Sequence, residues 1–176
     1  MNVIVRPGVS LADFLAWERE QPQKFEFDGT QPVPMTGGTV AHARLVRRIM
    51  EALHRLLPPG FEAFGGDLKV RTIVDRVRYP DVLVLRDAPA PDADTVEPVV
   101  VFEMLSASTM LTDLRVKPEE YAAVAALLAY VILPQDGPDG ATVLRRSNGW
   151  RAEPAAKKLD LPEIGVTIPL RELYGG

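Results

Sequence analysis

The spacing of apolar side chains predicts two helices in the first third of the chain. Between residues 39 and 57, apolar positions recur with the 3.6-residue period of an amphipathic helix, and a Pro-Pro-Gly segment directly afterwards ends the pattern. A shorter helix begins after Ser10, whose side chain can cap its first turn, and ends near Pro22. The helix at residues 39–57 is the longest that the sequence predicts.

Short strand-like runs lie on both sides of this long helix. Residues 25–27 alternate up to Asp28-Gly29, a pair that suits a two-residue hairpin turn, and the prolines of residues 31–35 limit the returning strand to a sheet edge. Further strands are predicted at residues 61–64, 67–74, 77–85 and 99–105. Their close succession predicts a mostly antiparallel meander.

A helix between two strands is predicted in the second half of the chain. The helix covers about residues 113–126; it follows the strand at residues 99–105 and leads into a strand at residues 129–133. This order is the signature of a βαβ unit with a right-handed crossover. The chain is therefore expected to have an α/β fold.

Turn residues mark two further segments. The stretch at residues 86–98 is rich in Pro, Asp and Ala, so we expect a surface loop between two strands and not a domain boundary. Residues 142–146 and 150–152 are expected to form a hairpin around Asn148-Gly149.

Composition narrows the class of protein. A chain of 176 residues with 47% hydrophobic and 25% charged residues is expected to fold as a single domain spanning residues 1–176. The absence of cysteine excludes disulfides, thiol nucleophiles and thiolate zinc sites, so any metal must bind oxygen or imidazole. A net charge of −4 argues against a protein that coats nucleic acid with a broad basic surface. Nucleic-acid binding would have to use a local patch.

The sequence also predicts a location. The first ten residues lack the charged and apolar regions of a secretory signal, and the longest apolar run, residues 121–133, is shorter than the roughly 20 residues of a membrane-spanning helix. We therefore expect a cytoplasmic protein without a membrane partner.

Two acidic residues interrupt the apolar runs of neighbouring predicted strands. Asp81 follows Pro80 at the entry to one run, and Glu103 lies near the end of the next, with Asp113 and Lys117 following on the predicted helix. Carboxylates in such runs are unfavourable to bury unless they bind a cation or another partner. Oxygen ligands with room for water and phosphate are those that Mg²⁺ prefers, although a structural salt bridge or cap explains such acids equally well.

This arrangement suits phosphodiester hydrolysis. A metal ion held by Asp81 and Glu103 can acidify a bound water and polarise the scissile phosphate, while Lys117 adds a mobile positive charge. The Pro-Asp pair alone is uninformative, because it recurs at Pro91-Asp92 and Pro138-Asp139 in turn-like surroundings. Only Asp81 opens a strand that is followed by a second acid-bearing strand.

Together these residues resemble the Uma-type family of restriction endonucleases within the PD-(D/E)xK nuclease superfamily. The resemblance runs through most of the chain and is carried by the following residues and segments: Phe25-Glu26, Asp28-Gly29, His42, Pro80-Asp81-Val82, residues 101–106, Ser108-Thr109, Asp113, Lys117, Tyr121 and Tyr130-Val131-Ile132. It implies a restriction-endonuclease-like mixed β-sheet flanked by helices, with an N-terminal helix and β-hairpin, and DNA cleavage with Mg²⁺ or Mn²⁺.

The resemblance also implies roles for single residues. Asp81 and Glu103 would be the metal ligands, Glu26 an additional acid, and Lys117 the catalytic lysine displaced onto the helix after Glu103. The superfamily's usual lysine position corresponds to Leu105, which cannot serve. The string Asp67-Leu68-Lys69 matches the acid-x-lysine pattern, but it precedes Asp81 and is interpreted as coincidental.

Basic residues on the long helix are candidates for contact with DNA phosphates. His42 lies near the helix N-terminus, where a phosphate meets unpaired N–H groups and a favourable dipole, and Arg44 and Arg48 follow on the same helix. A structural histidine and solvated arginines are the ordinary alternatives. Arg76 and Arg78 add to this basic density from a neighbouring strand. DNA is the expected partner, and a homodimer matches the twofold symmetry of a duplex.

Two other functions remain open at this point. One is a nuclease-fold protein that has lost cleavage and acts as a nucleic-acid-binding or protein-interaction module, which the acidic net charge and Leu105 both favour. The other is a small-molecule phosphohydrolase, which would need a closed pocket. Geometry discriminates between the first and a nuclease: in an enzyme, Lys117 must lie close to Glu103 and Asp81 instead of pointing into solvent.

Overall fold

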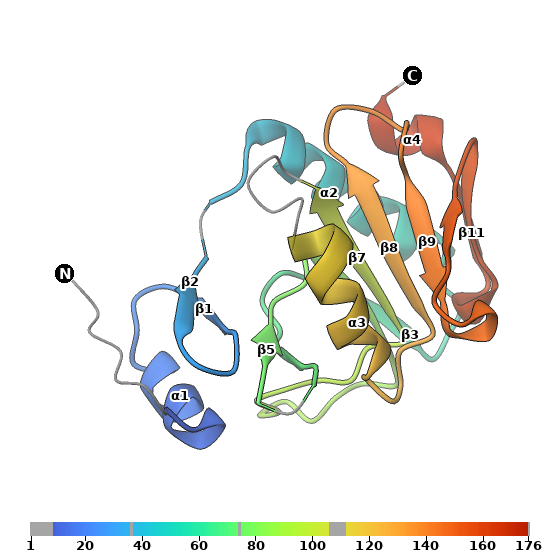
Figure 1. Cartoon of the computed structure of the whole chain (residues 1–176). Coiled ribbons are helices and arrows are strands. Elements are labelled where there is room, and N and C mark those ends of the chain that lie inside the picture. The colour runs from blue at the N-terminus through green and yellow to red at the C-terminus, as the bar shows by residue number, and fades with distance from the viewer. Residues whose placement is uncertain (1–8, 36, 74, 106–111, 176) are drawn as a thin grey trace.

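A six-stranded mixed sheet forms the centre of the protein in a computed structural model, which describes residues 9–35, 37–73, 75–105 and 112–175, without the side chains of residues 112 and 113 (Figure 1). The strand order is β10-β9-β8-β7-β6-β3. The strands are β3 (Phe61–Gly65), β6 (Val82–Arg86), β7 (Val100–Leu105), β8 (Ala129–Pro134), β9 (Thr142–Arg145) and β10 (Ala152–Pro154). Among the described strands of this sheet, only β7 and β8 pair in parallel, because the chain crosses between them through a helix as predicted.

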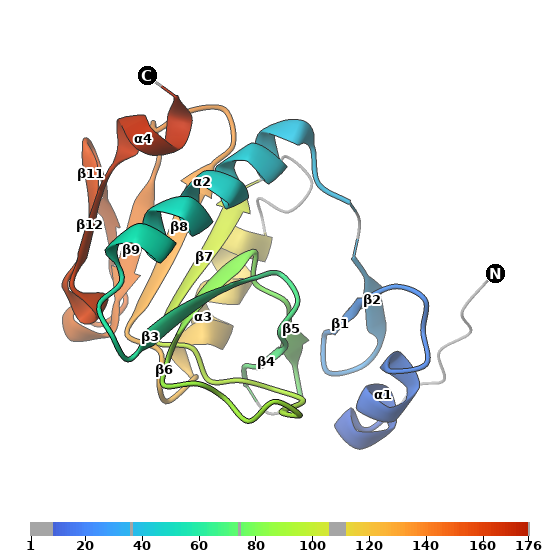
Figure 2. The same cartoon turned by 180° about the vertical axis from the view of Figure 1, so that it is seen from behind.

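Helices cover both faces of this sheet (Figures 1 and 2). On one face, α2 (Val40–Leu56) packs Ile49 and Leu53 against residues such as Phe102. On the other, α3 (Lys117–Ala122) packs Tyr121 against Val101 and its neighbours. Each fully buried side chain of this size contributes about 1.5–3 kcal/mol relative to exposure. The alternation of the strands thus places successive residues in two separate cores.

The starts predicted for the first two helices are confirmed, whereas the first helix ends at Glu18, before the end expected near Pro22. Ser10 caps α1 (Leu11–Glu18) by accepting the Asp13 backbone N–H at 3.1 Å, and Thr39 caps α2 in the same way. The helix expected at residues 113–126 is shorter: a π-helical turn (Thr112–Val116) precedes α3, which ends at Ala122. The stretch at residues 86–98 is a loop between β6 and β7, as expected.

The strands are divided between separate sheets and do not form the single, mostly antiparallel meander that was expected. The order of the second sheet is β2-β1-β5-β4, with β1 (Phe25–Phe27), β2 (Pro32–Pro34), β4 (Val70–Arg71) and β5 (Val77–Arg78), and the Phe14 ring of α1 stacks on Phe27 with ring centroids 4.7 Å apart. The single strand expected at residues 77–85 is therefore wrong, since β5 and β6 belong to different sheets. Pro80 separates them because proline has no N–H to donate to a ladder.

The first hairpin has a longer turn than the sequence predicted. Phe27 pairs with Pro32, so residues 28–31 form the loop instead of the two-residue turn expected at Asp28-Gly29. The Asp28 Oδ1 atom accepts the backbone N–H groups of Thr30 and Gln31, both at 2.8 Å. The Asp28 side chain thereby replaces the backbone partner of a tight turn, as in an Asx-turn.

The C-terminal part contains one predicted hairpin and elements that were not predicted. The hairpin of β9 and β10 is present, with Gly149 in the left-handed region at φ 71 after a 3-10 turn (Arg146–Asn148). Beyond it, β11 (Lys158–Leu161), a 3-10 turn (Pro162–Ile164), β12 (Val166–Pro169) and α4 (Leu170–Tyr174) close the core beside α2. No helix in the described part of the chain is long and apolar enough to cross a bilayer.

Candidate active site

The pairing of β6 with β7 places the two predicted metal ligands opposite each other. Val82 pairs with Phe102 in this antiparallel ladder, so continuing the register by one residue sets Asp81 opposite Glu103. Opposite residues of an antiparallel pair project from the same face of the sheet. The two acids that interrupt the apolar runs are thus neighbours at one end of the β6–β7 pair.

Two donors hold the Asp81 carboxylate. Its Oδ2 atom accepts the backbone N–H of Met104 at 2.8 Å, and its Oδ1 atom lies 3.1 Å from Nε2 of His42. The Asp81 side chain keeps about 20% of its surface exposed. It is therefore fixed by the fold and still accessible from solvent.

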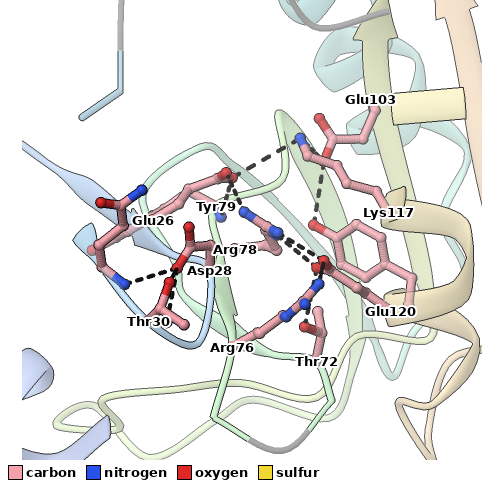
Figure 3. Close-up of polar contacts among 12 residues, drawn as sticks. Glu26, Asp28, Thr30, Thr72, Arg76, Arg78, Tyr79, Glu103, Lys117 and Glu120 are labelled. Carbon is pink, nitrogen blue, oxygen red and sulfur yellow. Dashed lines mark hydrogen bonds and ion pairs between the residues drawn. The ribbon is translucent and has the colours of Figure 1, made fainter. Parts of the chain in front are cut away.

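Glu103 lies against Lys117, which points into the protein (Figure 3). The Lys117 Nζ atom donates to Glu103 Oε1 at 3.0 Å, and the Tyr121 hydroxyl donates to the same oxygen at 3.2 Å. Lys117 and Tyr121 share one face of α3 because four residues separate them. Only 3% of Glu103 and 7% of Lys117 are exposed, so the pair lies almost entirely out of water.

The Tyr121 hydroxyl is a stable donor in this site. Burial raises its pKa well above the ordinary range, and the Glu103 carboxylate raises it further. The hydroxyl therefore stays protonated at neutral pH and keeps its hydrogen for Glu103. Tyr121 is one of the residues that carry the family resemblance, but no role was assigned to it from the sequence.

Glu26 approaches the site from the second sheet. Its Oε1 atom lies 3.9 Å from Lys117 Nζ, and its Oε2 atom accepts from Arg78 at 2.9 Å. The backbone N–H of Tyr79 donates to Oε1 at 3.3 Å. Phe25 and Phe27 are buried in the core on the opposite side of β1, and only 14% of the Glu26 side chain is exposed. Glu26 thus faces Lys117.

Arg78 and Glu120 form a buried fork that sequence reasoning missed. Arg78 Nε and Nη2 each donate to one oxygen of Glu120 at 2.7 Å, and Arg76 donates to Glu120 as well (Figure 3). Such paired bonds between guanidinium and carboxylate are strong and directional. Both arginines, which were considered for phosphate contact, thus bind a carboxylate within the protein. The sequence did offer one indication of this contact: Arg78 is a charged residue between the apolar residues Val77 and Tyr79.

The Arg78–Glu120 pair is expected to make the protein less stable at low pH. Burial alone would raise the pKa of Glu120, but hydrogen bonds and charge from Arg78 and then Arg76 outweigh it and hold the pKa below its ordinary value. Glu120 therefore contributes stability above its unfolded pKa of about 4.3, and this contribution disappears as the pH falls through the lower folded pKa.

Glu120→Gln is accordingly expected to lower the free energy of unfolding at pH 7, and its difference from wild type is expected to shrink as the pH falls below the unfolded pKa of about 4.3. Urea unfolding at pH values on both sides of this pKa measures it. The exposed neighbour Glu119 supplies the control, Glu119→Gln. A difference between Glu120→Gln and wild type that is the same at all pH values would contradict the linkage.

The residues proposed to contact phosphate have different surroundings. His42 lies between Asp81 and Gln135, with 3.5 Å between its Nδ1 atom and the Gln135 amide nitrogen. Arg44 is exposed on α2, whereas Arg48 donates to the backbone carbonyl of Leu173 at 2.9 Å. Phosphate contact by these three residues stays a prediction.

The Asp67-Leu68-Lys69 string lies outside this site. Lys69 pairs with Glu18 at 2.9 Å and Asp94 at 3.1 Å, while Asp67 is exposed, so the Asp67-Leu68-Lys69 string belongs to the contact between α1 and the second sheet. The side chain of Asp113, which is part of the resemblance, lies outside the described residues.

The carboxylates suit a divalent metal ion of the Mg²⁺ type. Asp81 and Glu103 offer hard oxygen donors at one end of the sheet, and Asp81 is open to solvent. In the described ranges, no three His, Asp or Glu side chains gather closely enough to hold a metal alone. Mg²⁺ is commonly bound by one or two carboxylates, with water and substrate phosphate completing its shell. The donor set therefore fits the ion implied by the resemblance.

Comparisons with known proteins agree with this fold. A family model described as "Putative restriction endonuclease", named Uma2, matches residues 11–170. An uncharacterized protein of Synechocystis sp., slr1290, is 29% identical over 179 residues, covering 97% of this chain and 93% of the relative. A protein of Anabaena variabilis, whose crystal structure is described as that of a "putative nuclease belonging to DUF820", superposes with a TM-score of 0.75 at 16% identity, covering 94% of this chain and 97% of that one.

The family match spans nearly the whole fold, from the first helix to the start of the last one. It includes every residue of the site described above, on both sheets and on α3. The structural likeness covers most of both chains and shows that the mixed sheet with flanking helices is shared. The chain therefore belongs to the Uma2 family of putative restriction endonucleases.

Proposed function

We propose that this protein hydrolyses DNA phosphodiester bonds in a reaction that depends on Mg²⁺ or Mn²⁺. One observation carries the proposal: the Lys117 ammonium is buried 3.0 Å from Glu103, and Glu103 follows Phe102, which pairs with Val82, the residue after Asp81. Two acids and a lysine at one end of a sheet are the groups that metal-assisted phosphoryl chemistry uses. Membership of a family described as restriction endonucleases supports the same activity.

Each residue has a defined part in this proposal. Asp81 and Glu103 would hold the ion, which when bound supplies Lewis-acid chemistry to a water and to the scissile phosphate. Lys117 places a positive charge beside Glu103 and can stabilise negative charge that develops on the phosphate. Tyr121 orients Glu103, and Glu26 stands on the other side of the lysine amine.

The helical position of Lys117 compensates for Leu105. Side chains two residues apart on a strand share a face, so Leu105 projects on the same side of β7 as Glu103. Leu105 packs with Val101 and Tyr121 on that side, which is the side that α3 covers. A lysine on α3 can therefore reach Glu103 from the same direction as a lysine at position 105 would.

A nuclease-fold protein that no longer cleaves DNA is the second candidate. The observation that favours it is the set of bonds inside the site: Glu103 is hydrogen-bonded by Lys117 and Tyr121, and Glu26 by Arg78. Such a network is stable without a substrate. A protein of this kind would bind DNA or another protein through the same surface and would not respond to Mg²⁺.

Homodimer formation is a further part of the proposal. One active site cuts one strand, and a twofold pair of sites matches the symmetry of a duplex. Cleavage of both strands by a single copy would require it to rebind in the opposite orientation.

Nicking of supercoiled plasmid distinguishes the candidates. Wild type is expected to nick with Mg²⁺ or Mn²⁺ and not with EDTA, and Lys117→Gln to nick about 100-fold more slowly, as when one transition-state donor is removed. Lys157→Gln is the matched control because Lys157 is exposed and distant in sequence. Wild type that binds DNA without nicking it under any metal condition would favour the second candidate. Nicking that continues in EDTA would contradict the metal requirement.

A further inference from the structure

A chain of polar contacts connects the start of α2 to Asp81. The Thr39 hydroxyl donates to Gln135 Oε1 at 2.8 Å, and the Gln135 amide nitrogen lies 3.5 Å from His42 Nδ1. His42 Nε2 in turn lies 3.1 Å from Asp81 Oδ1. Gln135 directly follows β8, whose end lies near the start of α2 and the end of β7 (Figure 1). These contacts therefore join the start of α2, the residue after β8 and the residue before β6.

The direction of each bond follows from Asp81. An ionised carboxylate only accepts hydrogen bonds, so the His42 Nε2 atom that faces it must carry a hydrogen. A neutral imidazole then has an acceptor at Nδ1. The group that faces Nδ1 must therefore be a donor, which the Gln135 amide nitrogen is.

The donors and acceptors are also matched at the Thr39 end of this series of contacts. With its NH₂ group toward His42, Gln135 turns its amide oxygen toward Thr39, whose hydroxyl hydrogen is available. That hydroxyl hydrogen is not needed elsewhere, since the Thr39 oxygen acts as an acceptor for the His42 backbone N–H at 3.1 Å in capping α2. The helix cap thus also fixes the amide orientation of Gln135.

We propose that Gln135 is a positioning residue of the active site, which holds His42 as the Nε2–H tautomer so that the ring donates to Asp81 and fixes its carboxylate. The proposal rests on the proposed function, because it gives Gln135 a part in presenting Asp81 to the metal. Partners that orient a metal ligand in this way typically change metal affinity or activity 10- to 100-fold when they are replaced.

Two substitutions distinguish this positioning role of Gln135 from a purely structural role. Gln135→Met keeps the length of the side chain and removes its donor, so Mn²⁺ affinity measured by calorimetry is expected to fall about tenfold. Gln135→Glu presents only acceptors to His42, so the ring is expected to gain a hydrogen at Nδ1. Gln23→Glu, at an exposed position, makes the same charge change away from the site.

Nitrogen-15 spectra of the imidazole rings read the tautomer directly. The chain has only two histidines, so His54 on α2 serves as an internal reference for His42. At pH 8.5, well above the ordinary imidazole pKa of about 6.5, wild type is expected to show His42 with Nε2 protonated and Nδ1 bare. Gln135→Glu is expected to shift the Nδ1 resonance to the protonated position, and Gln23→Glu to leave it unchanged.

The spectra test the inference independently of cleavage. Identical His42 spectra in wild type and Gln135→Glu, or a protonated Nδ1 in wild type, would overturn it even if the protein nicks DNA. Unchanged Mn²⁺ affinity in Gln135→Met would also overturn it. Wild type that shows the expected tautomer but neither binds metal nor nicks would instead overturn the proposed function.

Discussion

Asp81→Asn is expected to lower the plasmid-nicking rate on the order of 1000-fold with little change in fold. The amide keeps the size of the carboxylate and one oxygen that can accept the Met104 N–H, which donates at 2.8 Å in the wild type. It loses the negative charge that a divalent ion requires. Lewis-acid stabilisation by a metal ion amounts to several kcal/mol, and each 1.36 kcal/mol corresponds to a factor of ten in rate.

The chain offers a matched control for this experiment. Asp92 also follows a proline, but it is exposed in the loop between β6 and β7. Asp92→Asn is therefore expected to nick like wild type and to bind Mn²⁺ with the same affinity. If Asp81→Asn retained nicking within a factor of about three while remaining folded, the metal site would have to lie elsewhere, since a factor of ten already corresponds to about 1.36 kcal/mol.

Arg78→Ala is expected to lower the free energy of unfolding by about 3–5 kcal/mol, as when one partner of a buried ion pair is removed. The Arg78 side chain is 5% exposed and joins two acids from different parts of the fold, Glu120 on α3 and Glu26 on β1. Its removal leaves both carboxylates in the protein interior with fewer donors. The loss is a large fraction of the 5–15 kcal/mol by which a typical domain is stable.

Urea unfolding at pH 7 measures this change, and an exposed pair provides the comparison. Arg47 and Glu51 form an ion pair on α2 with side chains 60% and 59% exposed, so Arg47→Ala is expected to change stability by less than about 1 kcal/mol. Arg78→Lys is expected to recover only part of the loss, because lysine cannot form the paired bonds to Glu120. Equal losses in Arg78→Ala and Arg47→Ala would mean that the fork contributes no more than a surface contact.

Arg78 also explains how the two sheets share one site. Glu120 and Lys117 both lie on α3, and Arg78 on β5 binds Glu120 while its other nitrogen holds Glu26 near Lys117 (Figure 3). The second sheet is thereby tied to the helix that carries the candidate catalytic lysine. Variation in the position of this sheet would change the charge environment of Lys117.

The sequence by itself determined the elements whose signals are local. The helical period over residues 39–57, the capping side chain of Ser10 and the strand–helix–strand order after residue 99 all produced the expected structure. These signals depend on residues within one or two turns of each other, so they do not require knowledge of the rest of the fold.

Only the tertiary structure decided which distant residues meet. The run at residues 77–85 looked like one strand, and its division between two sheets depends on what packs against each half. The same division brings Arg78 to Glu120, 42 positions away, and turns Glu26 toward Lys117. Gln135 reaches His42 across 93 positions. Periodicity specifies the face on which a side chain lies, whereas the partner on that face is specified by the packing of the whole chain.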